Sequence, residues 1–271
     1  TCLEVLGFLI YSKRMTVSLP ASKMDKLRGR LEDWPRSRRT ATTKHVASLL
    51  GFFLHVSFVV RPGRFLVGRM LSSTGVELSA AGDEFSVRSR DRSRAVPLSP
   101  EFHGGLDFWC WLVGEGVAAR GGSLTAPMHN FVSRPPAPTI LTDASKTAVG
   151  GFCVELGLWW RYDLSGPERQ GFADGRFAIN VLERLGMVLA AYVLVVLRGD
   201  APVATGDRVL LRGGNNSAVH WINRCREGAY PRSGALMRLL GLLEIAGGWC
   251  FSAEHVPGVL NVEADGISRW E

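Results

Sequence analysis

The sequence predicts an α/β fold in which a mixed five-stranded sheet with flanking helices follows a smaller, mainly helical region. Two observations carry this prediction. After residue 138, segments typical of strands and helices alternate in the order βββαβααβα, which indicates one sheet packed with helices. Residues 134–138 (RPPAP) form a stiff proline-rich linker, so we expect residues 1–133 and 139–271 to be separate domains.

The first region is expected to begin with two strands, at residues 3–10 and 15–19. Helices are expected at residues 22–33, 43–59, 64–71 and 99–113, with Thr40 as a plausible cap of the second. Residues 72–98 are polar and mixed in charge, which predicts a loop. The basic part of this loop, residues 86–94, is either a solvated surface or a nucleic-acid contact.

The second region is expected to contain the sheet. Strands are predicted at residues 140–145, 149–155, 158–162, 208–212 and 249–255. Helices are predicted at residues 178–198, 215–224, 233–246 and 261–270, the last with Asn261 as its cap. The long apolar helix at 178–198 is the natural element to cover the sheet.

Composition bounds the class of protein. The 271 residues include 46% hydrophobic residues and carry a formal charge of +7, with a pI near 9.5. This balance suits a polyanionic partner such as nucleic acid, although a soluble basic protein has it too. The longest apolar run, residues 187–197, is too short to span a bilayer, so no membrane partner is expected.

The five cysteines are widely spaced, odd in number and without a Cys-x-x-Cys pair. This usage predicts free thiols in a reducing compartment, and therefore an intracellular protein. The chain begins with Thr1 inside a strand-like pattern, which predicts that it is a piece of a longer protein.

Three acids stand where an ordinary core would not place a carboxylate. Asp143 ends an apolar stretch, Glu183 is the only acid in the long apolar helix, and Asp265 opens the last helix. A buried charge costs several kcal/mol unless it is paired or bound to a metal, so the three together predict a divalent metal site. Taken singly, Asp143 is better explained as a strand-end turn residue, Glu183 as the partner of Arg184 or another base, and Asp265 by the helix dipole.

Four short motifs resemble the ribonuclease H domain of retrotransposon reverse transcriptases, with the nearest resemblance to DIRS-like elements. They lie at residues 142–145 (TDAS), 179–183 (INVLE), 255–258 (HVPG) and 261–269 (NVEADGISR). The resemblance covers residues 138–271 and implies a ribonuclease H-like fold there. Residues 44–70 resemble the segment just after the polymerase palm, and residues 98–100 with Trp109 and Trp111 resemble the stretch before the ribonuclease domain. These resemblances imply a thumb- or connection-like region at 1–133. The chain has no Tyr-x-Asp-Asp sequence, so no polymerase active site is expected in it.

The resemblance also implies an activity: two-metal hydrolysis of the RNA strand of an RNA–DNA hybrid. Asp143, Glu183 and Asp265 would be the ligands of Mg²⁺ or Mn²⁺, ions that prefer such hard oxygen donors. His255 would assist proton transfer or product release. The implied partners are an RNA–DNA hybrid or other nucleic acid and the remainder of the reverse transcriptase polyprotein.

Three further residues are implied to contact the substrate, namely Ser145, Asn215 and Arg224. Contacts of this kind fix the position of the phosphate backbone without reading base sequence. Basic side chains that could follow the hybrid backbone are Arg161, Arg224, Arg226 and Arg232. Trp159, Trp160, Trp221 and Trp249 either stack on bases or pack in the core.

One position departs from the family pattern. Where the family has Arg-Gly-Asp-Asn-x-Ser-Ala-Val, residues 212–219 are RGGNNSAV, so Gly214 replaces a metal-ligand Asp. We considered Asp207, Glu254 and Glu263 as substitutes and expect none of them to restore the site. The sequence therefore predicts an impaired nuclease. The alternatives are a non-catalytic nucleic-acid or protein-binding module on the same scaffold and a domesticated host protein.

Overall fold

The computed structural model describes residues 1–75, 78–81, 84–87, 93–116, 123–131, 138–176, 178–197, 208–224 and 233–270. The chain divides into two compact units, Thr1–Phe131 and Val132–Glu271. Residues 134–137 of the predicted linker lie outside the described part, as do 88–92 of the basic loop and Asp207, Arg226 and Arg232.

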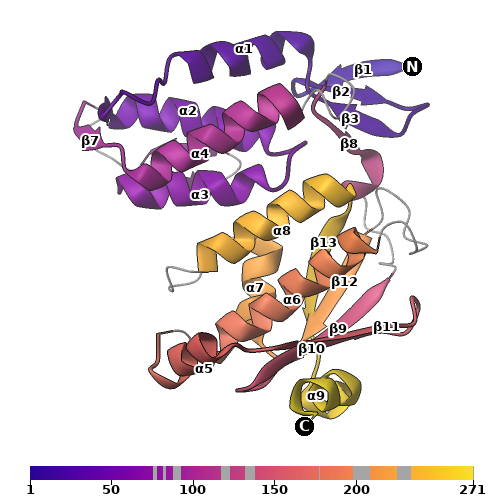
Figure 1. Cartoon of the computed structure of the whole chain (residues 1–271). Helices are drawn as coiled ribbons and strands as arrows, with labels where there is room; N and C mark the ends of the chain where they lie inside the picture. Colours follow the sequence, from indigo (N-terminus) through magenta and orange to yellow (C-terminus); the bar gives the residue numbers. More distant parts are fainter. Residues whose placement is uncertain are drawn as a thin grey trace. The chain divides into compact units, whose positions relative to one another are not determined.

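The first unit combines four helices with short antiparallel strands (Figure 1). One sheet has the strand order β1 (Cys2–Val5), β2 (Phe8–Tyr11), β3 (Thr16–Ser18), β8 (Thr125–Pro127). Two strand pairs are β4 (Thr40–Thr42) with β7 (Ala95–Pro97) and β5 (Leu78–Ala81) with β6 (Glu84–Val87). The helices are α1 (Ala21–Glu32), α2 (Thr43–Val56), α3 (Gly63–Thr74) and α4 (Pro100–Trp111), with short helical turns η1 (Leu112–Gly116) and η2 (Met128–Asn130).

Each helix of this unit buries one apolar side. Leu27 of α1, Val46 of α2, Val67 of α3 and Trp109 of α4 are fully buried. The Trp109 ring stacks on Phe53 of α2, with 4.5 Å between the ring centroids. The four helices predicted from sequence are therefore confirmed, and a shared apolar core holds them together.

Three predictions for this region are wrong. The strand expected at 3–10 is a hairpin, because Leu6 and Gly7 take positive φ values of 51° and 75° and turn the chain between β1 and β2. Thr40 does not cap α2; it lies in β4, and the Thr42 side chain accepts the hydrogen bond from the backbone N–H of His45 instead. The loop expected at 72–98 contains β5, β6 and β7.

The second unit is built on a five-stranded sheet with the order β11-β10-β9-β12-β13. Its strands are β9 (Thr139–Ala144), β10 (Ala148–Cys153), β11 (Leu158–Asp163), β12 (Arg208–Gly213) and β13 (Cys250–His255). β10 runs antiparallel to β9 and β11, whereas β12 is parallel to β9 and β13. The predicted mixed sheet is confirmed, and its central strand is β9, which ends at Asp143 and Ala144.

Helices cover both faces of this sheet (Figure 1). They are α5 (Gly166–Ala173), α6 (Ile179–Val196), α7 (Asn216–Arg224), α8 (Ser233–Gly247) and α9 (Val262–Arg269), with η3 (Gly258–Leu260) before the last. Figure 1 shows α6, α7 and α8 on one side and α9 on the other. The sequence missed α5, which is short and mostly polar, although Ser165 and Glu168 form a capping box at its start.

The core helix α6 approaches the sheet closely. A Cβ on Gly186 would lie 2.9 Å from a methyl of Val149, so only glycine fits there without a shift. By length and hydropathy α6 is the one helix of the described residues that could cross a membrane, and 56% of it is buried inside the fold. Burial on this scale is usual for the core helix of a folded domain, and it is what takes Glu183 out of water.

On the opposite face of the sheet, α9 packs closely against β10. A Cβ on Gly150 would lie 2.9 Å from the backbone nitrogen of Ser268 and 2.7 Å from a methyl of Ile267. We expect Gly150→Ala to lower the free energy of unfolding of this unit by about 1–3 kcal/mol, because the backbone of α9 must move. Hydrogen exchange of α9 peptides in a urea series measures the effect.

A matched control lies on the same helix. A Cβ on Gly266 meets nothing within 4 Å, so Gly266→Ala should leave stability unchanged or raise it by about 0.5–1 kcal/mol through helix propensity. Equal protection of α9 in Gly150→Ala and the unsubstituted chain would contradict the close approach.

Candidate active site

Asp143 lies near the end of the central strand β9, directly opposite Gly150 of β10. Its Oδ2 accepts a hydrogen bond of 2.7 Å from the hydroxyl of Ser268 on α9. Burial raises the pKa of Asp143 above its ordinary value, the Ser268 hydrogen bond opposes that shift, and the nearby charge of Asp265 adds to it. Asp143 is thus a partly desolvated carboxylate with a second acid close by.

Glu183 projects from α6 toward Asp143 and is 7% exposed. Burial and then the charge of Asp143 raise its pKa from 4.5 to about 8. Its Oε2 is buried and makes no hydrogen bond within the described part of the chain. The alternative in which Arg184 neutralises Glu183 has no support, since the guanidinium of Arg184 lies over the ring of Trp221, 3.8 Å from its centroid.

Asp265 approaches from the other face of the sheet, in the first turn of α9. Its Oδ1 accepts a hydrogen bond of 2.6 Å from Nε of Arg269, one helical turn later. Its charge acts on Asp143, and Asp143 acts on Glu183. The three acids are therefore linked in pairs through Asp143. Within the described residues, no three His, Cys, Asp or Glu side chains are placed to share one metal ion.

Gly214 follows the end of β12 and borders the same group of acids. A Cβ at this position would lie 3.8 Å from Oε1 of Glu183 and would meet nothing else within 4 Å. Its neighbour Gly213 is different, because a Cβ there would lie 2.7 Å from Met187. Position 214 therefore has room for a side chain that reaches Glu183. Because the residue there is glycine, no carboxylate occupies this space.

Of the acids considered as substitutes, the two that the structure describes do not fill this room. Glu254 is paired with Arg212 of the neighbouring strand at 3.1 Å, and both side chains are substantially exposed. Glu263 is exposed on α9. His255 is exposed at the end of β13, opposite Gly213, so the strand register places it one residue from Gly214.

The residues expected to contact substrate have local structural roles. The side chain of Asn215 accepts hydrogen bonds from the backbone N–H groups of Ser217 and Ala218 and so begins α7. The hydroxyl of Ser145 donates to the carbonyl of Ser268 at 2.8 Å and accepts from the N–H of Ala148. Arg224 is exposed in the last turn of α7. Whether these residues touch a substrate stays a prediction.

Of the other expected contacts, Arg161 donates to the carbonyl of Ile267 and to Asp163, which ties β11 to α9. Trp249 is buried and Trp160 packs against the core, as the packing alternative predicts. Trp159 is 59% exposed and lies beside Trp270, with 5.9 Å between ring centroids.

Sequence reasoning missed Ser268 and Arg269 and assigned Asn261 only as a helix cap. Asn261 makes no side-chain cap; its Nδ2 donates instead to the carbonyl of Thr142, next to Asp143. Ser268 and Arg269 follow Asp265 by three and four residues, the spacing that places side chains on one helix face. This spacing could have predicted that both side chains lie near Asp265.

Asp143 and Glu183 supply some, but not all, of the oxygen ligands that one divalent cation needs. Carboxylate oxygens are the donors that Mg²⁺ and Mn²⁺ prefer, and the buried, unpartnered Oε2 of Glu183 beside Asp143 lacks a positive partner within the described residues. A second cation has less support, because position 214 supplies no side-chain oxygen and Asp265 is engaged by Arg269.

Comparison with known proteins gives solved structures only; no protein-family model and no curated protein matches the chain. Ribonuclease H1 from the halophilic archaeon Halobacterium salinarum NRC-1 is 19% identical, over 48% of this chain and 92% of its own, with a TM-score of 0.34. The foamy viral protease–reverse transcriptase in complex with an RNA/DNA hybrid is 14% identical, over 93% of this chain and 29% of its own, with a TM-score of 0.27.

The same foamy viral protein in complex with double-stranded DNA is 13% identical, over 95% of this chain and 45% of its own, with a TM-score of 0.27. The chain thus spans less than half the length of these viral structures. The fold assignment rests on the strand order and directions of the sheet rather than on these scores.

Proposed function

We propose that this chain is the C-terminal part of a retrotransposon reverse transcriptase and that its second unit is a ribonuclease H-type domain with weakened activity. The motifs at 142–145, 179–183 and 261–269 support this proposal, as does a mixed sheet whose central strand carries Asp143. The narrower placement among DIRS-like elements rests on the motifs alone. The first unit would be the thumb- or connection-like region of the same protein.

The observation that carries the proposal is the environment of Glu183. A buried carboxylate without a hydrogen-bond partner or a described cation beside it costs several kcal/mol, and a fold keeps such a group when a ligand uses it. Glu183 faces Asp143 and the space at position 214. This arrangement suits a cation held between two strands and a helix.

Each residue then has a defined role. Asp143 and Glu183 would hold the cation, and Ser268 fixes the orientation of the Asp143 carboxylate through its hydrogen bond. Asp265 is restrained by Arg269 and would have to leave that ion pair to act as a ligand. The chemistry that such a cation would supply, when bound, is activation of a water and stabilisation of developing charge on the phosphate. His255 stands exposed at the end of β13, in the position of the family residue that assists proton transfer or product release.

Gly214 is the reason to expect weak hydrolysis. Two-metal hydrolysis needs carboxylate ligands that clamp both ions, and glycine at this position offers no carboxylate. The second candidate function, a binding module for nucleic acid or protein, is favoured by the absence of a three-acid cluster in the described residues. The formal charge of +7 serves either function.

The test uses the full chain and a labelled RNA–DNA hybrid with Mg²⁺ or Mn²⁺. We expect salt-sensitive binding and cleavage of the RNA strand slower than about 0.01 s⁻¹, well below the range of about 1–10³ s⁻¹ for ordinary enzymes. Asp143→Asn should abolish the residual cleavage and leave binding in place.

Cleavage above about 1 s⁻¹ would contradict the weakened site. Binding with no cleavage, unchanged by Asp143→Asn and by removal of divalent cations, would favour the binding module. Binding that does not weaken with salt would argue against a nucleic-acid partner altogether.

A further inference from the structure

The first unit contains a polar pocket that the proposed nuclease function does not use. It has a volume of about 420 Å³ and is lined by Arg30, Asp33, Trp34, Arg38, His45, Ser48 and Leu49. These residues come from the end of α1, the segment after it and the first turns of α2. A cavity of this size is within the range of about 300–1,000 Å³ for small-molecule sites.

Two guanidinium groups of the pocket are held in place by main-chain carbonyl groups. Arg30 donates to the carbonyl of Ser48 and lies over the ring of Phe52, 4.7 Å from its centroid. Arg38 donates to the carbonyls of Asp33 and Thr40, at 3.1 and 3.3 Å. The guanidinium of Arg38 also lies over the Trp34 ring, 4.5 Å from its centroid.

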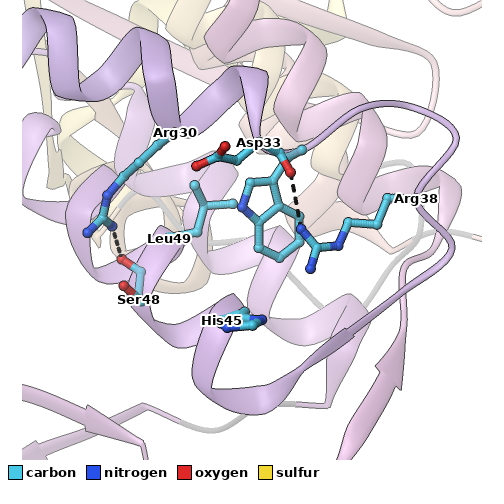
Figure 2. A pocket seen from close by; sticks show the side chains of 7 residues that line it. Arg30, Asp33, Arg38, His45, Ser48 and Leu49 are labelled. Atoms are coloured by element: carbon cyan, nitrogen blue, oxygen red, sulfur yellow. Dashed lines mark hydrogen bonds between the residues drawn. The ribbon is translucent and has the colours of Figure 1, made fainter.

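Their charges are not neutralised by an acid. Among the described residues neither Arg30 nor Arg38 forms an ion pair, and Asp33, the one acid of the lining, contributes its main-chain carbonyl to Arg38 rather than its carboxylate. Figure 2 shows Arg30 and Arg38 at two ends of the pocket, with Leu49 between them and His45 below. Two fixed cations at separate ends suit a ligand with more than one negative group.

We propose that this pocket binds a ligand carrying two linked phosphate groups, one near Arg30 and the other near Arg38. Guanidinium groups held by carbonyl oxygens keep N–H donors free for phosphate and lose little conformational entropy on binding. A free diphosphate and successive phosphates of a nucleic-acid strand share this chemistry. The proposal does not depend on the nuclease function of the second unit.

The test is calorimetric titration of the full chain at about 50 mM salt, where screening is moderate. The probes are inorganic phosphate, pyrophosphate, adenosine diphosphate and a short single-stranded oligothymidine. We expect pyrophosphate to bind at least tenfold more tightly than phosphate, and Arg30→Gln and Arg38→Gln each to weaken pyrophosphate about tenfold. Stronger binding of adenosine diphosphate than of the oligonucleotide identifies a free diphosphate as the source, and the reverse identifies a strand.

Two further variants control for charge and folding. Arg28→Gln removes the same charge from α1 outside the pocket, where Arg28 pairs with Asp25, so it should leave the affinity unchanged. Asp33→Asn removes the opposing carboxylate and should strengthen pyrophosphate binding several-fold. Equal affinity for phosphate and pyrophosphate, no saturable binding of either, or an equal loss in Arg28→Gln would overturn the proposal.

Discussion

Gly214→Asp should raise the rate of RNA-strand cleavage by at least about a hundredfold in Mg²⁺ or Mn²⁺, which corresponds to about 2.7 kcal/mol of transition-state stabilisation. The substitution is sterically mild. A Cβ at position 214 meets only Oε1 of Glu183, at 3.8 Å, and Gly214 is not among the glycines with positive φ. The new carboxylate would face Glu183 and so add a further acid to the group around Asp143.

The size of the effect follows from electrostatics. Two unit charges 4 Å apart interact with about 4 kcal/mol at an effective dielectric constant of 20, and a divalent cation roughly doubles this. Desolvation of the new carboxylate opposes the gain. About a third of this total, roughly 2.7 kcal/mol, already corresponds to a hundredfold change, so the prediction requires that this fraction survive desolvation.

Two variants make the measurement specific. Gly214→Asn has nearly the same size without the charge, so it should gain much less cleavage than Gly214→Asp. Adding Asp143→Asn to Gly214→Asp should abolish the gain, because Asp143 links the other two acids. Equal cleavage by Gly214→Asp and the unsubstituted chain would mean that the absent carboxylate does not limit this site.

The sheet of the second unit was predictable because its strands are marked locally. Apolar residues alternate or run together in each strand, and turn residues separate them, as between Ala144 and Ala148. The three acids drew attention for a related reason: Asp143 ends an apolar stretch, Glu183 interrupts an apolar helix, and Asp265 opens the last helix. The vacancy at Gly214 was visible once the residues around it, 212–219, were compared with the family pattern.

Other features depend on contacts that the sequence pattern does not mark. The turn at Leu6 and Gly7 splits an apolar run that looks like one strand, because a non-glycine residue takes positive φ there. The bond from Ser268 to Asp143 joins residues 125 positions apart. The pairing of Asp265 with Arg269 was predictable as a local helix pair, but its effect on Asp143 required the geometry of α9 on the sheet.

Glu183→Gln should remove most of the pH dependence of stability that the buried acid imposes. The pKa of Glu183 is raised from 4.5 to about 8, so between these values the folded state holds a proton that the unfolded state has released. Stability is therefore full below pH 4.5 and is lost as the pH rises toward 8, at up to about 1.4 kcal/mol per pH unit. The loss over the window is on the order of a few kcal/mol, and glutamine cannot titrate.

The measurement compares both chains in metal-free buffer at pH 5 and pH 8. Hydrogen exchange of α6 peptides in a urea series reports the second unit alone, and comparison at equal pH cancels the intrinsic exchange rate. The new amide of glutamine adds a cost of about 1–3 kcal/mol if it stays unpartnered, but this cost is the same at both pH values. The difference in the free energy of unfolding between pH 8 and pH 5 therefore reports the titration of the Glu183 carboxylate alone.

The expected result is a clear fall in stability from pH 5 to pH 8 in the unsubstituted chain and a much smaller fall in Glu183→Gln. Glu254→Gln is the matched control, because the Glu254 side chain is 57% exposed and paired with Arg212. That variant should keep the full pH dependence. Added Mn²⁺ should flatten the slope only where Glu183 is present, since a cation and a proton compete for the same carboxylate. A slope that survives in Glu183→Gln would place the titrating group elsewhere and remove the main support for a cation at this site.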